Sequence, residues 1–139
     1  MRAALLLLAL GAVLLGGQVS AFGRKQRYAV KGRLLCGTSP ASNIQVKLVD
    51  EDDGPDPDDE MDVRQTDSNG EFSLSGEETE MTDIDPRLKF YHDCNDGMKP
   101  CQRKWKMDLP DKYINKGVMD VGTINLEMIW PEEERDCFH

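Results

Sequence analysis

Apolar side chains recur at every second position in several short stretches of the chain, as expected for strands with one buried face. The pattern predicts strands within residues 28–36, 44–48, 61–65, 72–74, 87–92, 103–109 and 121–129. Turn-forming clusters such as Asp67-Ser68-Asn69-Gly70 separate these stretches, and no helical periodicity follows the first 21 residues. The chain is therefore predicted to be all-β, a seven-stranded and mainly antiparallel sandwich.

Two of the predicted strands, residues 87–92 and 103–109, flank a turn that contains Asn95, Gly97 and Pro100. The outward positions of this hairpin and the residues near its turn are rich in lysine and arginine. The predicted basic face comprises Arg87, Lys89, Tyr91, Lys99, Arg103, Lys104 and Lys106. Such a face either keeps a sheet surface soluble or docks an anionic partner, with Tyr91 as a flat apolar contact.

The chain begins with Met1-Arg2, an apolar run to Leu15 and the small residues Val19-Ser20-Ala21. This order is typical of a secretory signal peptide cleaved after Ala21, which leaves a single domain at residues 22–139. The alternative, a membrane anchor, needs about 20 apolar residues, and no stretch of this chain reaches that length. The protein is therefore predicted to be secreted and extracellular, without a transmembrane segment.

All four cysteines, Cys36, Cys94, Cys101 and Cys137, lie in the exported part. An even count in an oxidising compartment predicts two disulfides, for which three pairings exist. Because Cys94 and Cys101 bracket the hairpin turn, we expect them to pair with each other, which leaves Cys36 for Cys137. A zinc site is disfavoured, since no C-x-x-C pair exists and only His92 and His139 are available to assist.

Charge is unevenly distributed along a chain of net charge −9. Residues 22–49 carry only basic charges, whereas acidic side chains dominate residues 50–85. The net negative charge and the predicted export argue against a nucleic-acid partner. The acidic run is expected to be a solvated loop, with a weak calcium loop as the alternative. The candidate ligands are Asp52, Asp53, Asp56, Asp58, Asp59 and Glu60, although the EF-hand order is absent.

Several motifs together resemble the nematode transthyretin-like family. They are the signal peptide and residues 30–36 (VKGRLLC), 66–72 (TDSNGEF), 91–94 (YHDC), 101–104 (CQRK), 109–113 (LPDKY) and 135–137 (RDC). The resemblance implies a prealbumin-like sandwich, secretion and no established catalytic activity. It also implies that the first and last strands lie parallel and side by side, which suits a bridge between Cys36 and Cys137.

An enzyme is not expected. The hydrolases of 5-hydroxyisourate, which share the prealbumin-like fold, end in Tyr-Arg-Gly-Ser, whereas this chain ends in residues 135–139 (RDCFH). His92 falls among the inward positions of its strand, and no nucleophile or phosphate-loop motif is present.

The leading hypothesis is a secreted binding or recognition protein that bridges an anionic surface, a lipid headgroup or an acidic protein, to a partner. It would use its basic and acidic regions as two separate contact surfaces. The alternative is a carrier of a small hydrophobic ligand. No cofactor is expected beyond the weak calcium loop, and the sequence specifies neither the partner nor the oligomeric state.

Overall fold

The structure, a computed structural model, describes residues 23–51 and 58–139. Its elements are β1 (Arg24–Cys36), β2 (Ser39–Pro40), β3 (Gln45–Asp50), β4 (Asp59–Gln65), β5 (Glu71–Glu80), β6 (Pro86–His92), β7 (Gln102–Asp108), the short 3-10 helix η1 (Asp111–Tyr113), β8 (Met119–Asn125) and β9 (Glu134–Asp136). The predicted signal peptide at residues 1–21, and Asp52, Asp53 and Asp56 of the predicted calcium loop, lie outside the described residues.

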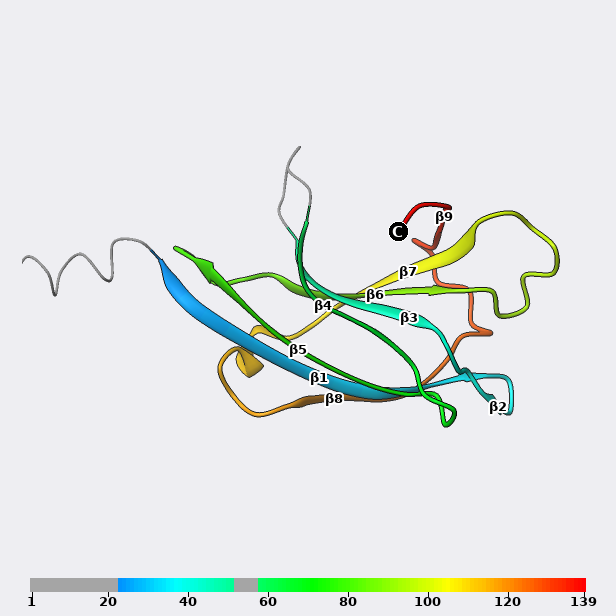
Figure 1. The fold of residues 1–139 in the computed structure, drawn as a ribbon, viewed down its shortest axis with the longest axis horizontal. Coiled ribbons are helices and arrows are strands. Elements are labelled where there is room, and N and C mark those ends of the chain that lie inside the picture. Colours follow the sequence, from blue (N-terminus) through cyan, green and yellow to red (C-terminus); the bar gives the residue numbers. More distant parts are fainter. Residues whose placement is uncertain (1–22, 52–57) are drawn as a thin grey trace, which may run out of the picture.

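The strands form two sheets that pack face to face (Figure 1). In the first sheet, β1 pairs antiparallel with β5 on one side and parallel with β8 on the other, and β2 folds back on the end of β1. The second sheet has the order β4-β3-β6-β7-β9 and is antiparallel throughout. The predicted all-β sandwich is confirmed. Residues 23–51 and 58–139 form nine strands rather than the predicted seven, because β2 and β9, of two and three residues, are too short to show periodicity.

Two strands are longer than the alternation predicted. β1 begins at Arg24, before the predicted start at residue 28, and β5 continues to Glu80, beyond the predicted end at residue 74. In the β1–β5 register, Arg24 lies opposite Glu80 and Arg27 opposite Glu77. Opposite charges placed directly across two strands stabilise their pairing, which extends both strands past the apolar positions.

The core consists of the inward-facing side chains of both sheets. Tyr28, Val30 and Leu34 of β1 are buried against Leu88 and Phe90 of β6. Gly32 lies among them because a Cβ there would come within 2.7 Å of the Phe72 ring. The alternation therefore predicted correctly which face of β1, β5, β6 and β7 is buried, whereas Val63 of β4, expected to face inward, is 39% exposed.

The predicted disulfide pairing is wrong. Cys36 pairs with Cys94, and Cys101 pairs with Cys137. The β6–β7 ladder ends at the pair His92 and Arg103, so it never brings Cys94 opposite Cys101. Cys94 is instead buried beside the end of β1, where its bridge joins the two sheets. Cys101 and Cys137 extend the β7–β9 register by one residue beyond the pair Gln102 and Asp136.

Candidate functional site

Three lysines lie directly opposite one another on the outer face of the second sheet. Lys47 of β3 is the cross-strand partner of Lys89 of β6, and Lys89 is the partner of Lys106 of β7. Adjacent strands are about 4.8 Å apart, and like charges in directly opposite positions destabilise a sheet. We call this set the lysine row. Sequence reasoning found Lys89 and Lys106 but missed Lys47, because only the strand register places it beside them.

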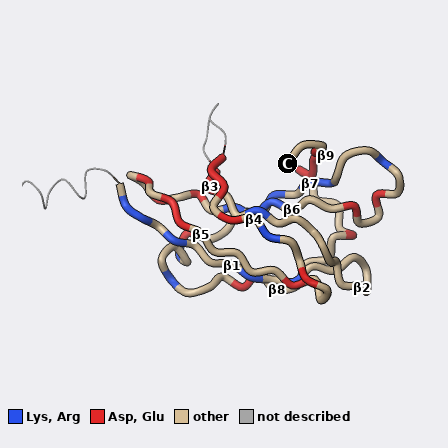
Figure 2. The backbone as a smooth tube through the Cα atoms, in the orientation of Figure 1, with Lys and Arg blue, Asp and Glu red and all other residues tan. Residues whose placement is uncertain are grey.

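Each ammonium group of the lysine row meets a carboxylate from the acidic region. Lys47 Nζ lies 2.6 Å from Glu60 Oε1, Lys89 Nζ contacts Asp58 Oδ2, and Lys106 Nζ lies 3.5 Å from Glu51 Oε1. The three lysine side chains are only 11%, 13% and 29% exposed. Figure 2 shows acidic residues of β3 and β4 beside basic residues of the same sheet.

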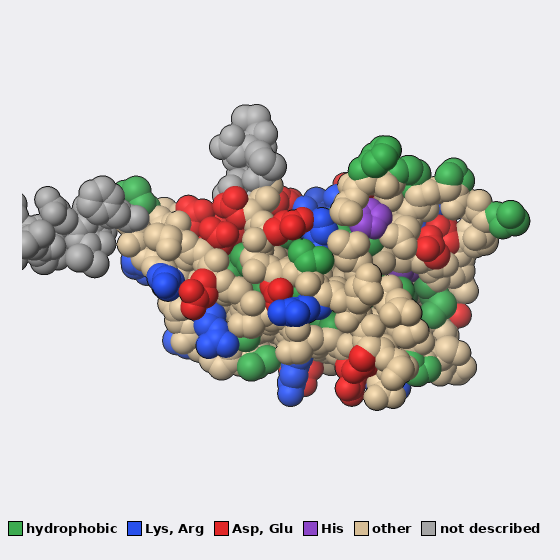
Figure 3. All heavy atoms as spheres, in the orientation of Figure 1, with side chains coloured by type: hydrophobic (Ala, Val, Ile, Leu, Met, Phe, Trp, Pro, Cys, Tyr) green, Lys and Arg blue, Asp and Glu red, His purple; other side chains and the backbone are tan. Residues whose placement is uncertain are grey.

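The basic and acidic regions were expected to be separate contact surfaces, and that expectation is wrong for the residues described here. Glu51, directly after β3, and Asp58 and Glu60, at the start of β4, place their carboxylates over the face that the same sheet presents to solvent. In the space-filling view, acidic and basic side chains lie next to one another near β3, β4 and β6 (Figure 3). The two regions therefore neutralise each other over the lysine row.

Tyr91, which was predicted to point into solvent, points outward but is covered. Its ring is only 3% exposed, because the His139 ring stacks on it with centroids 4.1 Å apart and an interplanar angle of 13°. Lys47 Nζ and Lys104 Nζ lie 5.5 and 5.9 Å from the Tyr91 ring centroid. Burial, with the negative charges of Asp136 and other nearby carboxylates, raises the pKa of Tyr91 to about 12.

The remaining basic residues of the predicted face differ in their surroundings. Arg87 contacts Glu51 and lies 2.6 Å from Asp108, and Lys104 lies 3.4 Å from Asp136. Lys99 is exposed in the β6–β7 loop. The predicted face is therefore brought together by the sheet, except at its turn, but most of its charges already have partners.

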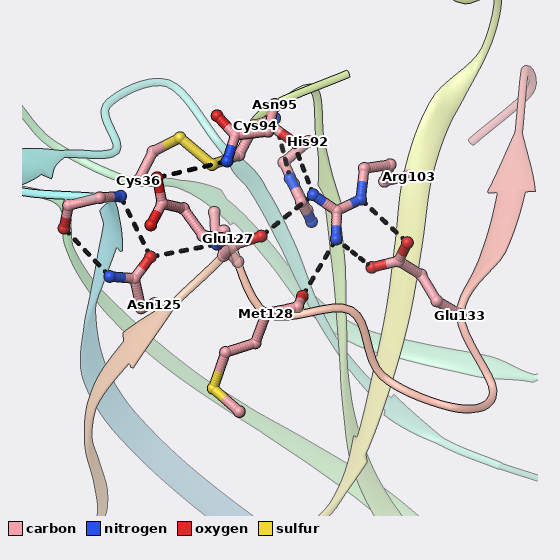
Figure 4. Close-up of a disulfide and its surroundings, with 11 residues drawn as sticks. Cys36, His92, Cys94, Asn95, Arg103, Asn125, Glu127, Met128 and Glu133 are labelled. Atoms are coloured by element: carbon pink, nitrogen blue, oxygen red, sulfur yellow. Dashed lines mark hydrogen bonds and ion pairs between the residues drawn. A yellow bond between two sulfur atoms is a disulfide. The ribbon is translucent and has the colours of Figure 1, made fainter.

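Arg103 does not belong to this face. Its side chain points into the sandwich, where Nε and Nη2 donate to the carboxylate of Glu133 at 2.9 and 2.7 Å (Figure 4). The other donors reach the backbone carbonyls of Cys94, Leu126 and Met128. Arg103 thus joins β7 to the β6–β7 and β8–β9 connections, and it is a structural residue. Its assignment to the basic face is therefore wrong, because the side chain is buried and bonded within the fold.

His92 is also enclosed. It is buried, and its Nδ1 accepts the backbone N–H of Cys94 at 3.1 Å. Burial, together with the positive charge of Arg103, lowers the pKa of His92 to about 4. A neutral, inaccessible imidazole with one nitrogen already occupied is a poor general base.

The three described ligands of the predicted calcium loop, Asp58, Asp59 and Glu60, have different partners. Asp58 and Glu60 contact lysines, whereas Asp59 lies with Asp50 and Glu80 in a group whose ligand atoms are within 4.8 Å of one another. One oxygen of Asp50 accepts the backbone N–H of Asp85. An acidic group of this kind is common without an ion, so the calcium loop stays a prediction.

The outer face of the first sheet carries a groove of about 540 Å³. Lys31 and Arg33 of β1 line it, with Glu71 of β5 and Asp120 of β8 on either side. Charged walls of both signs do not suit a hydrophobic ligand. In the part of the chain that the structure describes, no helix has the length and hydropathy required to cross a bilayer.

A family model and several known proteins that resemble this chain all indicate the same family. A family model described as "TTR-52: Transthyretin-like family" matches residues 31–110. Transthyretin-like protein 5 of Caenorhabditis elegans is 47% identical over 131 residues, which cover 91% of this chain and 94% of that protein. Transthyretin-like protein 46 of the same organism is 53% identical over 119 residues, covering 81% of this chain and 66% of that protein.

A third relative, transthyretin-like protein 2 of Caenorhabditis elegans, is 44% identical over 142 residues, covering 94% of this chain and 96% of that protein. A 9R-lipoxygenase of known structure from Cyanothece PCC8801 is 22% identical with a TM-score of 0.49, over 94% of this chain and 23% of its own. That likeness is too weak to inform fold or function. The family model and the relatives show that the chain belongs to the transthyretin-like family.

Proposed function

We propose that this chain is a secreted, non-enzymatic binding protein whose lysine row receives an anionic partner. The partner would present several phosphate or carboxylate groups, as an anionic lipid surface or an acidic protein does. The observation that carries the proposal is the register that sets Lys47, Lys89 and Lys106 side by side on three adjacent strands.

Stability alone does not call for such a row. Opposed like charges destabilise a sheet, and partly buried ion pairs contribute little compared with apolar side chains of similar size. The register therefore concentrates positive charge at some expense in stability, which is a common feature of sites that recognise anions.

An external anion would exchange with the internal carboxylates. Glu60, which contacts Lys47, keeps a side chain that is half-exposed, so that its displacement needs little rearrangement of the core. Binding by exchange of ion pairs is sensitive to ionic strength, and the charge of the face should govern the association rate more than the dissociation rate.

Two further observations agree with a bridging, non-catalytic role. The charged groove lies on the first sheet, across the sandwich from the lysine row, so two partners would not compete for one face. His92 is buried with a lowered pKa, and the names of the relatives carry no enzymatic activity. The groove on the first sheet is lined by charges of both signs, which does not favour the alternative of a hydrophobic-ligand carrier.

The test is co-flotation of the protein with phosphatidylserine-containing vesicles and with neutral phosphatidylcholine vesicles, at low and high salt, with and without Ca²⁺. We expect binding to the anionic vesicles that weakens with salt, is stronger in the Asp58→Asn/Glu60→Gln variant and is weaker in Lys89→Gln/Lys106→Gln. Lys116→Gln, an exposed lysine in the connection between η1 and β8, is the matched control. Equal, salt-insensitive binding to both vesicle types would exclude the lipid partner. In that case, binding of soluble poly-glutamate would support an acidic protein as the partner, and its failure to bind would exclude that partner as well.

A further inference from the structure

His139 covers one end of the basic face in the manner of a bound ligand. Its ring stacks on Tyr91, its Nε2 lies 2.7 Å from Gln102 Oε1, and its Nδ1 lies 3.5 Å from Asp136 Oδ1. Only 12% of the His139 side chain is exposed, although the residue as a whole is exposed, and its neighbour Phe138 is 93% exposed as a whole residue. Of these two adjacent side chains, only the imidazole turns back onto the sheet.

The segment that carries His139 is attached independently of this contact. β9 pairs with the start of β7, and the bridge between Cys101 and Cys137 holds the chain two residues before His139. The His139 ring can therefore leave Tyr91 without unfolding the segment, because its anchors lie upstream.

The surface beneath His139 combines two features. The Tyr91 ring offers a flat aromatic face, and Lys47 Nζ and Lys104 Nζ lie within 6 Å of its centroid. Within the described residues, each of these lysines is partnered by one carboxylate, Glu60 for Lys47 and Asp136 for Lys104. A planar ring would take the place of the imidazole, and an anionic group on that ring would take the place of one carboxylate.

We propose that Tyr91, Lys47 and Lys104 form a subsite for a planar aromatic anion of the aryl phosphate class, and that His139 is its built-in occupant. A dianionic phosphate matches the two flanking ammonium groups, and the aryl ring reproduces the stack that His139 now makes. The inference rests on the proposed function, because it assumes that the basic face binds anions. It deepens that function by assigning a ligand class to the Tyr91 end of the face and by identifying His139 as the residue that covers it.

The experiment compares wild type and His139→Ala by isothermal titration calorimetry with phenyl phosphate. If the covered form holds about nine molecules in ten, removal of the cover tightens apparent binding about tenfold. Inorganic phosphate and phenol, which lack the ring or the charge, should bind at least tenfold more weakly to the variant. A phosphotyrosine peptide and its unphosphorylated form then distinguish a protein-borne aryl phosphate from a free one.

Two controls separate a cover from a merely structural contact. Phe138→Ala removes an exposed neighbouring ring and should bind phenyl phosphate as wild type does. Tyr91→Leu in the His139→Ala background should abolish the gain in affinity.

Spectrophotometric titration of Tyr91 should show its pKa fall from about 12 toward the ordinary value of 10 in His139→Ala. An unchanged pKa, or an uncovered Tyr91 without tighter binding of phenyl phosphate, would overturn the inference. If phenyl phosphate binds His139→Ala but neither vesicles nor poly-glutamate bind any variant, the subsite is supported and the proposed function is excluded.

Discussion

The outer faces of the two sheets carry similar residues in opposite circumstances. On the second sheet, Lys47, Lys89 and Lys106 each meet a carboxylate brought from the acidic region. On the first sheet, Lys31 lies opposite Asp120 and Arg33 opposite Glu71, yet no ion pair joins these partners in the described part of the chain. Alternation along a strand thus predicts which side chains face outward but does not predict whether their charges are free.

Two carboxylates that line the groove of the first sheet are used differently. Asp67 accepts the backbone N–H groups of Asn69 and Glu71, and Asp120 accepts that of Gly122. These are local turn contacts, and they direct one oxygen of each acid to its own loop. The acids of the second sheet reach across strands instead, so their effect depends on the whole fold.

The largest effect should come from removing the bridge that joins the two sheets. Cys36→Ser/Cys94→Ser opens a loop of 58 residues and should lower the free energy of unfolding by about 4 kcal/mol on the chain-entropy model. Chemical denaturation measures this loss. Cys101→Ser/Cys137→Ser is the comparison, because its loop of 36 residues gives a similar entropic loss within one sheet. In the Cys101→Ser/Cys137→Ser variant, backbone amide hydrogen exchange should become faster in β9 but not in β1. Faster exchange in β1 would contradict the assignment of this bridge to the second sheet alone.

The pH dependence of the free energy of unfolding should report on His92, a buried residue of the second sheet. The pKa of His92 is about 4 in the folded protein and about 6.5 unfolded, so below pH 6.5 only the unfolded state gains the proton. Stability should therefore fall by about 3 kcal/mol as the pH drops from 6.5 to 4, with no further loss from this group below that.

Denaturation of His92→Gln across the same pH range measures this contribution. The variant should lack the slope between pH 6.5 and 4, whatever its absolute stability. Asp96 and Asp136, whose pKa values are lowered in the fold, destabilise both proteins alike as they protonate, so the difference isolates His92. Parallel pH profiles would show that His92 is protonated in the folded state.

A direct test of the two faces substitutes one lysine on each. Lys89→Gln leaves the half-buried carboxylate of Asp58 without its ammonium partner and should lower the free energy of unfolding by about 1–2 kcal/mol. Lys31→Gln should change it by less than about 0.5 kcal/mol, as expected for an exposed side chain without an ion pair. Asp58→Asn combined with Lys89→Gln should recover part of the loss. Equal losses at Lys89 and Lys31 would remove the contrast between the faces.

The smallest effect is the repulsion within the lysine row. A double-mutant cycle with Lys47→Gln and Lys89→Gln should give a double variant that is more stable than the sum of the single losses, by about 0.2–1 kcal/mol. The coupling should shrink in high salt, because the ammonium groups are partly exposed. A coupling of the opposite sign would mean that the two lysines support rather than repel each other.

Local pattern predicted much of this architecture. The hairpin strands were expected at residues 87–92 and 103–109 and are found at Pro86–His92 and Gln102–Asp108. The turn at residues 67–70 is also confirmed, with the Gly70 amide bonded to the Asp67 carbonyl. Side-chain alternation and turn residues act over a few positions, so they can be recognised without the fold.

The candidate site was only half predicted. The basic residues of β6 and β7 could be assigned to one face from their spacing, but Lys47 could not be added without the β3–β6 register. Asp58, which contacts Lys89, lies 31 positions from it along the chain, and His139, which stacks on Tyr91, lies 48 positions from that residue. No local signal links such residues, because their contact depends on a crossover between sheet neighbours and on the path of the last segment.

By itself the sequence determined an all-β sandwich of the transthyretin-like family, the buried faces of β1, β5, β6 and β7, and the presence of two disulfides. These follow from short-range periodicity, recognisable motifs and the count of cysteines. The tertiary structure alone decided which cysteines pair, which charges neutralise one another and which aromatic ring is covered. Those outcomes require residues distant in the chain to meet, and their partners are selected by strand order and register, which many sequences of the same pattern leave open.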